Sequence, residues 1–204
     1  MLEVLIQPTN FFRALAERKP NLVAPFFIVI AGTVTASLGQ VLLVRLLPSF
    51  VPGGLAVQLV LALVGGVVFG MLLWGLGGLM IRLLAGPDSR AWEVYGWASV
   101  PALLVGLVLV PLGALFPITG DLSPLPPATD PEALRAWQRE YQQVVGTASG
   151  TRVLQGLGIA GSLWSFWIIW SGLRVLAPSR ALVATLGVAA VSLAFTLWGI
   201  LAQR

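Results

Sequence analysis

The chain has 204 residues, of which 57% are hydrophobic and only 10% are charged. Soluble domains usually carry about 25% charged residues, so this composition excludes an ordinary soluble domain and predicts a membrane protein. The chain holds no cysteine and no histidine, which excludes disulfides, thiolate metal sites and the commonest general base. We therefore expect no bound metal, no cofactor and no nucleic-acid partner.

The first twenty residues are predicted to form an interfacial helix. The stretch PTNFFRALAERKP, from Pro8 to Pro20, places Phe11, Phe12 and Leu15 on one side of a helix and the charged residues elsewhere. This pattern suits a helix that lies at the membrane surface, and the alternative is a docking site for a cytoplasmic partner. The charges before the first apolar run argue against a cleaved signal peptide.

Five long uncharged runs follow, and each is long enough for a membrane span, which needs about 20 apolar residues. Prolines and glycines at positions 48 to 54 break the second run near its start, so we expect its helix to begin at about Leu55. We predict a single all-α domain over 1–204, a polytopic membrane protein with an interfacial N-terminal helix and an outer amphipathic helix. The five transmembrane helices are expected at about 22–46, 55–84, 92–117, 152–175 and 180–202.

The second span carries a ridge of glycines. Gly66, Gly70 and Gly77 lie on one helix face, and Gly66 with Gly70 forms a GxxxG pair. Such a ridge allows two helix backbones to approach closely. We interpret it as packing within the bundle, because five helices must first pack against each other, and a homo-oligomer is the alternative.

A short polar stretch, GPDSRAWEVYGWASVPALL, separates the second and third spans. Gly86 and Pro87 are typical of a helix end, and Asp88 or Ser89 is expected to cap the next helix. We interpret Gly86 to Pro101 as the working face of the protein, and the alternative is a capped turn with an ordinary aromatic belt. The candidate partner-binding residues are Asp88, Arg90, Trp92, Glu93 and Tyr95.

The third span is expected to be kinked and internal. Ala98, Ala102 and Gly106 recur every four residues, which forms a second ridge of small residues that allows close helix contact. Pro101 lies inside this ridge and removes one helical hydrogen bond. Gly96 and Pro101 complete the predicted helix-packing set.

The segment 118–151 is the long outer loop. Its first part is rich in proline, and the helix 130–145 follows, with Asp130 as a good N-cap and Pro131 in the first turn. Leu134, Trp137 and Tyr141 share one face of this helix. Because Trp and Tyr favour the headgroup level, we expect the helix to lie on the outer surface.

The lysines and arginines beside the spans predict the orientation. A cytoplasmic N-terminus places seven on the inside, including the cluster Arg13, Arg18 and Lys19, and five on the outside. We therefore expect a multi-pass protein of a bacterial inner membrane, with its N-terminus cytoplasmic and its C-terminus outside.

Three motifs in the order of the chain carry a family resemblance. They are Pro8 with Phe11 and Phe12, then Tyr95, Gly96, Ala98 and Pro101, and finally Trp164, Trp167, Trp170, Ser171, Gly172 and Leu173. Together they resemble the Yip-one domain family of Ypt/Rab-interacting membrane proteins. The resemblance implies a five-span protein, and eukaryotic members engage Rab-type GTPases through a cytosolic N-terminus. This chain has only about twenty residues before its first span and lacks an Asp-Leu-Tyr-Gly-Pro motif, so it looks like a short bacterial-type member.

An intramembrane enzyme is not expected, because the predicted spans offer no nucleophile–base pair, paired carboxylates or metal site. We favour a non-catalytic integral membrane scaffold or adaptor, of the kind that organises membranes or their traffic. Its partners are membrane lipids and a cytoplasmic or membrane protein. The alternative is a passive transporter or channel for a small solute or lipid.

Overall fold

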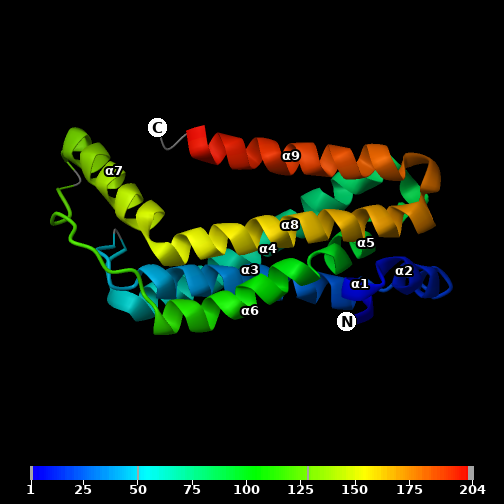
Figure 1. The fold of residues 1–204 in the computed structure, drawn as a ribbon, viewed down its shortest axis with the longest axis horizontal. Coiled ribbons are helices and arrows are strands. Elements are labelled where there is room, and N and C mark those ends of the chain that lie inside the picture. Colours follow the sequence, from blue (N-terminus) through cyan, green and yellow to red (C-terminus); the bar gives the residue numbers. More distant parts are fainter. Residues whose placement is uncertain (1, 50, 128, 202–204) are drawn as a thin grey trace.

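The computed structural model describes residues 2–49, 51–127 and 129–201, and side chains as far as Ala194, and this part of the chain contains helices and no strands. Figure 1 shows long helices running side by side, with two short N-terminal helices at one end of the bundle. The elements are α1 (Leu2–Ile6), α2 (Pro8–Ala16), α3 (Val23–Val44), α4 (Gly54–Ala85), η1 (Pro87–Ser89), α5 (Ala91–Ala98), α6 (Val100–Leu115), α7 (Pro131–Thr147), α8 (Ser149–Leu176), η2 (Pro178–Arg180) and α9 (Ala181–Leu201).

Within the described residues, four helical segments are long and apolar enough to cross a membrane, which confirms the polytopic all-α fold. They are Val23–Val44, Gly54–Ala85, Pro87–Leu115 and Ser149–Leu176. The fifth predicted span corresponds to α9. Its apolar segment Pro178–Ala194 is shorter than the other four. The end of that predicted span, at residue 202, lies outside the described residues.

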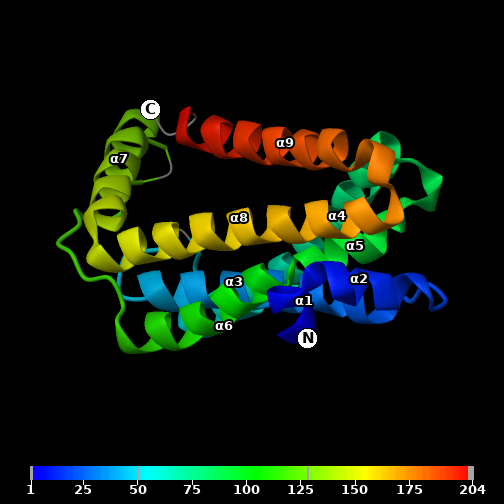
Figure 2. The same ribbon diagram turned by 45° about the vertical axis from the view of Figure 1, so that its right-hand side comes forward.

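The helix α3 is the centre of the bundle, packed between α4 and α6. The helix α8 contacts α2, α5 and α6, and α9 contacts α4 and α8. Figure 2 shows α9 beside the end of α8 near η2 and increasingly far from it towards the C-terminus. The main core cluster therefore lies at the end of the bundle that holds α1, α2 and α5.

The N-terminal helix α2 is docked on the protein rather than lying only on the membrane surface. Phe12 is fully buried, and its ring occupies the space beside Gly172 of α8, where an added Cβ would come within 2.9 Å of it. Phe11 meets Trp97 edge-on, with ring centroids 4.9 Å apart. The apolar side of α2 that we assigned to lipid thus binds the bundle instead, because α8 and α5 supply an apolar surface at this end.

The third span contains a break between two helices, where the sequence predicts a kink. The helix α5 ends at Ala98, and α6 begins at Val100 with Pro101 in its first turn. Proline suits a first turn, since its missing N–H has no helical partner there. Ser99 satisfies the carbonyls before the break: its Oγ donates to Tyr95 O at 3.0 Å and its N–H donates to Gly96 O at 3.2 Å.

The helix α7 is capped as predicted, because Asp130 Oδ1 accepts a hydrogen bond from the Ala133 N–H at 3.0 Å. Trp137 stacks on Tyr141 and is buried, and its Nε1–H donates to Ser123 O at 2.8 Å. The proline-rich segment therefore covers Trp137, so this side chain is packed inside the protein rather than exposed on the surface. Burial also raises the pKa of Tyr141.

Glycines of α4 lie where the backbones of α3 and α4 nearly touch. An added Cβ on Gly66 would lie 2.8 Å from Val34 Cα, and one on Gly70 would lie 2.9 Å from Ile30 Cδ1. Thr33 Oγ1 donates to Gly66 O at 2.7 Å across the same contact. Close approach thus brings polar atoms of two helices together in an apolar environment.

The other glycines of the predicted packing set also face neighbouring helices. A Cβ on Gly77 would overlap the Tyr95 ring, and one on Gly96 would overlap Pro25 of α3. On Gly106 it would lie 3.1 Å from Ala36 N. Ala98 and Pro101 are buried, whereas Ala102 is exposed on a side of α6 that lines a cavity described below.

We predict that Gly70→Leu lowers the free energy of unfolding by about 1–3 kcal/mol, because overpacking forces α3 and α4 apart. Gly65→Leu is the matched control, since Gly65 lies one residue away from Gly66 and a Cβ there meets nothing within 4 Å. Thermal unfolding in detergent measures both variants. Equal unfolding temperatures for Gly70→Leu and Gly65→Leu would contradict the close contact.

Candidate functional site

The polar stretch between the second and third spans folds into a rigid turn. Gly86 ends α4 with φ 98° and donates its N–H to Arg82 O at 2.9 Å. The single turn η1 follows, closed by Ser89 Oγ, which donates to Gly86 O at 2.7 Å. Arg90 then has φ 47° and is the only non-glycine residue with a positive φ in the described chain. Such a conformation persists only where the surroundings hold it.

The guanidinium of Arg90 holds this turn against the N-terminal segment. Its Nη1 donates to Leu15 O at 2.7 Å, and its Nη2 donates to Ala16 O at 3.4 Å and also to Arg18 O. The Leu15 and Ala16 carbonyls lie in the last turn of α2, where a helix leaves its last C=O groups without intrahelical partners, and Arg18 follows just after that helix. A cation at this position also interacts favourably with the negative end of the helix dipole.

Glu93 completes the attachment from one turn further along α5. Its side chain is 1% exposed, and its Oε2 lies 3.5 Å from Arg90 Nη1. Its Oε1 accepts a hydrogen bond from the Asn21 N–H at 3.2 Å. Oε2 has no hydrogen-bond partner in the described structure, so the Asn21 N–H and the Arg90 guanidinium together stabilise the carboxylate. Together, Arg90 and Glu93 fix residues 15–21 to the start of α5.

Glu93 is a buried carboxylate within a helical segment that is apolar enough to cross a membrane. This segment is the third of its kind along the chain and begins at Pro87. The predicted third span, about 92–117, already contains Glu93, although the uncharged run begins only at Val94. The carboxylate is tolerated here because a guanidinium and a backbone N–H both face it.

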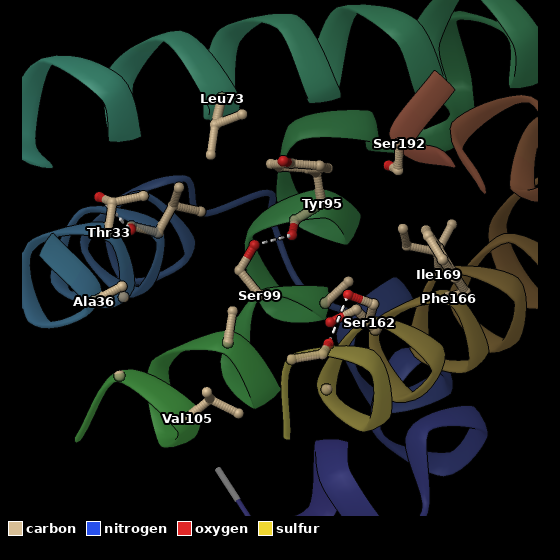
Figure 3. A pocket seen from close by; sticks show the side chains of 18 of the residues that line it. Thr33, Ala36, Leu73, Tyr95, Ser99, Val105, Ser162, Phe166, Ile169 and Ser192 are labelled. Atoms are coloured by element: carbon tan, nitrogen blue, oxygen red, sulfur yellow. Dashed lines mark hydrogen bonds between the residues drawn. The ribbon is translucent and has the colours of Figure 1, made fainter. Parts of the chain in front are cut away.

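The two aromatic candidates point in different directions. Trp92 covers Gly78 of α4, accepts a hydrogen bond on its carbonyl from Trp74 Nε1 at 3.2 Å, and has the Arg82 guanidinium 5.7 Å from its ring centroid. Tyr95 lies over Gly77 and faces a cavity in the middle of the bundle (Figure 3). Both side chains are half-buried rather than exposed.

A groove of about 490 Å³ lies beside this turn. The residues 20–22 form one side of it, and the end of α4, η1 and the start of α5 form the other. Its polar and aromatic lining residues are Arg82, Asp88, Arg90, Trp92 and Glu93. Four of the five predicted partner-binding residues are therefore together, and Tyr95 is not with them.

Sequence reasoning missed Arg82 and the residues 20–22. Arg82 has a recognisable signal, because it is the one charge near the end of the second span. The participation of Pro20 and Leu22 has no signal in the local sequence, since it depends on the long-range bonds of Arg90 and Glu93.

The predicted capping role of Asp88 and Ser89 is wrong. The N-cap of α5 is Arg90, and it makes no side-chain capping bond. The turn η1 places Asp88 two residues before the cap and leaves it exposed, while the Ser89 hydroxyl bonds back to Gly86. Asp88 is thus free of the structural role that we expected for it.

We predict that Arg90→Ala releases the N-terminal segment, because the carbonyls of residues 15, 16 and 18 lose the guanidinium and the buried Glu93 carboxylate loses its counter-charge. The loss of such a pair costs about 3 kcal/mol or more. Hydrogen exchange of the amides in residues 8–21 should rise strongly in detergent. The control is Arg13→Ala, since Arg13 lies exposed on the same helix and bonds Asn10. Protection like that of the wild type in Arg90→Ala would show that Arg90 does not hold this segment.

Comparison with known proteins gives one positive result. The Yip1 domain matches residues 2–201, which is nearly the whole chain. No curated protein and no solved structure matches the sequence. The Yip1 domain family comprises membrane proteins that are generally not enzymes. The chain, with its helical bundle and its three ordered motifs, therefore belongs to the Yip1 domain family.

Proposed function

We propose that this protein is a non-catalytic membrane scaffold that binds a protein partner in the groove between residues 20–22 and the turn at Pro87–Trp92. The observation that carries the proposal is the attachment of residues 15–21 by Arg90 and Glu93. This attachment fixes both sides of the groove before any partner arrives, and a pre-formed surface loses less conformational entropy on binding.

The chemistry of the groove supports a protein partner. Trp and Arg are the residue types that dominate binding energy at protein interfaces, and Trp92 and Arg82 lie together here. Asp88 is exposed at the rim and has no ion pair in the described structure. The one buried charged side chain among the described residues, Glu93, is occupied by Arg90 and Asn21, which favours a structural role for it over catalysis.

We further propose that the groove faces the cytoplasm. The support is the excess of lysine and arginine at this end of the chain. Because the chain has no natural cysteine, Asp88→Cys and Gln143→Cys provide single labelling sites at opposite ends of the bundle. A membrane-impermeant maleimide added to intact cells should label Gln143→Cys and not Asp88→Cys. The opposite pattern would reverse the orientation.

We predict that Asp88→Lys abolishes partner binding while leaving the protein folded. A reversed charge at the rim opposes a complementary partner, and a cost of about 1.4 kcal/mol already lowers the affinity tenfold. The variant and the wild type are crosslinked in cells, and the recovered proteins are quantified.

Asp121→Lys is the matched control, because Asp121 is an exposed aspartate in the outer loop. Partners that belong to the groove should be lost in Asp88→Lys and retained in Asp121→Lys. The same partners at the same yield in both variants would contradict the proposal, provided that both unfold at the temperature of the wild type.

One observation favours the second candidate function, passive passage of a small solute or lipid. A cavity of about 430 Å³ lies among the spans. No charged side chain lines it, so it offers no site for an ion, and an apolar solute is the class that its lining supports.

A further inference from the structure

The cavity of about 430 Å³ lies at the middle of the bundle and is lined by residues from α3, α4, α5, α6, α8 and α9. Figure 3 shows Thr33, Leu73, Tyr95, Ser162 and Ser192 around it, each from a different helix. Thr33, Leu73 and Ser162 lie near the midpoints of α3, α4 and α8. In a spanning bundle, these midpoints are level with the hydrocarbon core of the bilayer.

The cavity opens sideways because α9 leaves the bundle. Ala181, Ala184 and Val188 of α9 are buried, whereas Val191 and Leu193 on the next turn are exposed. Figure 2 shows the same divergence of α9 from α8. On the facing walls, Phe69 of α4 and Ser162 of α8 are exposed. The molecules that reach this opening in a membrane are lipid chains or another protein.

The lining favours an apolar occupant. Ser99 and Ser162 use their hydroxyls on carbonyls of their own chain segment, at 3.0 Å to Tyr95 O and 2.8 Å to Gly158 O. Thr33 donates to Gly66 O. The rest of the lining is mainly apolar, and a trapped water needs about two to four polar partners. Filling by water is therefore disfavoured over most of the cavity.

Its size suits a small ligand. The cavity lies within the range of about 300–1,000 Å³ that is usual for small ligands. An empty space of this size would leave the surrounding side chains without van der Waals partners.

We propose that this cavity binds one hydrocarbon chain of a membrane lipid, which enters from the bilayer between α4, α8 and α9. The chain supplies the missing apolar contacts and requires no polar group from the protein. The site is separate from the groove beside Arg90, and the inference rests on neither candidate function, because holding a lipid chain needs no protein partner and no passage across the membrane.

The test uses the full chain in phosphatidylcholine vesicles that contain phosphatidylcholine with a photoactivatable diazirine on one acyl chain. After irradiation, mass spectrometry locates the lipid adducts along the sequence. We expect an excess of adducts on the cavity-lining turns of α8, from Gly158 to Phe166, and on Leu73. The outward residues Leu182 and Leu186 of α9, which are well exposed, measure the background labelling by bulk lipid.

Ser162→Phe places a ring inside the cavity, and the lost hydroxyl bonds only its own helix at Gly158 O. The matched control is Leu163→Phe, since Leu163 is adjacent and is 65% exposed on the outer side of α8. The excess of adducts at Leu73 should disappear in Ser162→Phe and remain in Leu163→Phe. Ala102→Leu fills the cavity from α6 and should reduce the same signal, which provides a second variant if Ser162→Phe fails to fold.

Three results would overturn the proposal. One is an even distribution of adducts over all exposed helix faces. Another is an unchanged excess at Leu73 in folded Ser162→Phe and Ala102→Leu. The third is a crosslink from the cavity to a peptide of a second copy. Loss of the partner in Asp88→Lys is measured separately, so failure of the lipid site and failure of the scaffold proposal are distinguishable.

Discussion

The contact of the Arg90 guanidinium with the last carbonyls of α2 holds the N-terminal end of this protein together. It joins a segment before the first span to a turn after the second, more than seventy residues away along the chain. The same side chain balances the buried Glu93 carboxylate, which in turn binds the Asn21 N–H. Without the guanidinium, this carboxylate would be an uncompensated buried charge, which is strongly destabilising. The groove therefore depends on Arg90, and the docking of α2 depends on Arg90 together with the packing of Phe12 beside Gly172.

The short helix α5 connects this polar end to the interior of the bundle. On one side, Glu93 faces the N-terminal segment, and on another, Tyr95 faces the central cavity. Gly77 and Gly78 of α4 make room for the Tyr95 and Trp92 rings, so α4 and α5 can lie close together although both rings are large. The break at Ser99 then allows α6 to follow its own direction along α3. The small residues thus set both the direction of α5 and the position of its aromatic side chains.

Most of the fold follows from patterns within single segments. The uncharged runs are long enough to identify the spans, and the prolines and glycines between Pro48 and Gly54 mark a helix end that needs no tertiary information. The features that the sequence does not reveal are tertiary. The left-handed conformation of Arg90, the burial of Glu93 and the insertion of Phe12 beside Gly172 arise from partners in distant parts of the chain. A local pattern shows Asp88 as a cap and Phe12 as a lipid contact, because the competing partner is not visible in it.

The groove and the cavity differ in what the membrane allows them to bind. The groove is at the end of the spans, where charged groups such as Arg82 and Asp88 remain in contact with water, so its selectivity can come from charge and hydrogen bonds. The cavity is at mid-depth and is mainly apolar, so it distinguishes ligands by shape and by the absence of polar atoms. The course of α9 exposes the cavity, since Ala181, Ala184 and Val188 in its first turns are buried and Val191 and Leu193 in the following described turn are exposed. A bundle in which α9 stayed in contact over its whole length would close the cavity. Because α9 diverges from the bundle, the cavity is open to the lipid and a hydrocarbon chain can enter it.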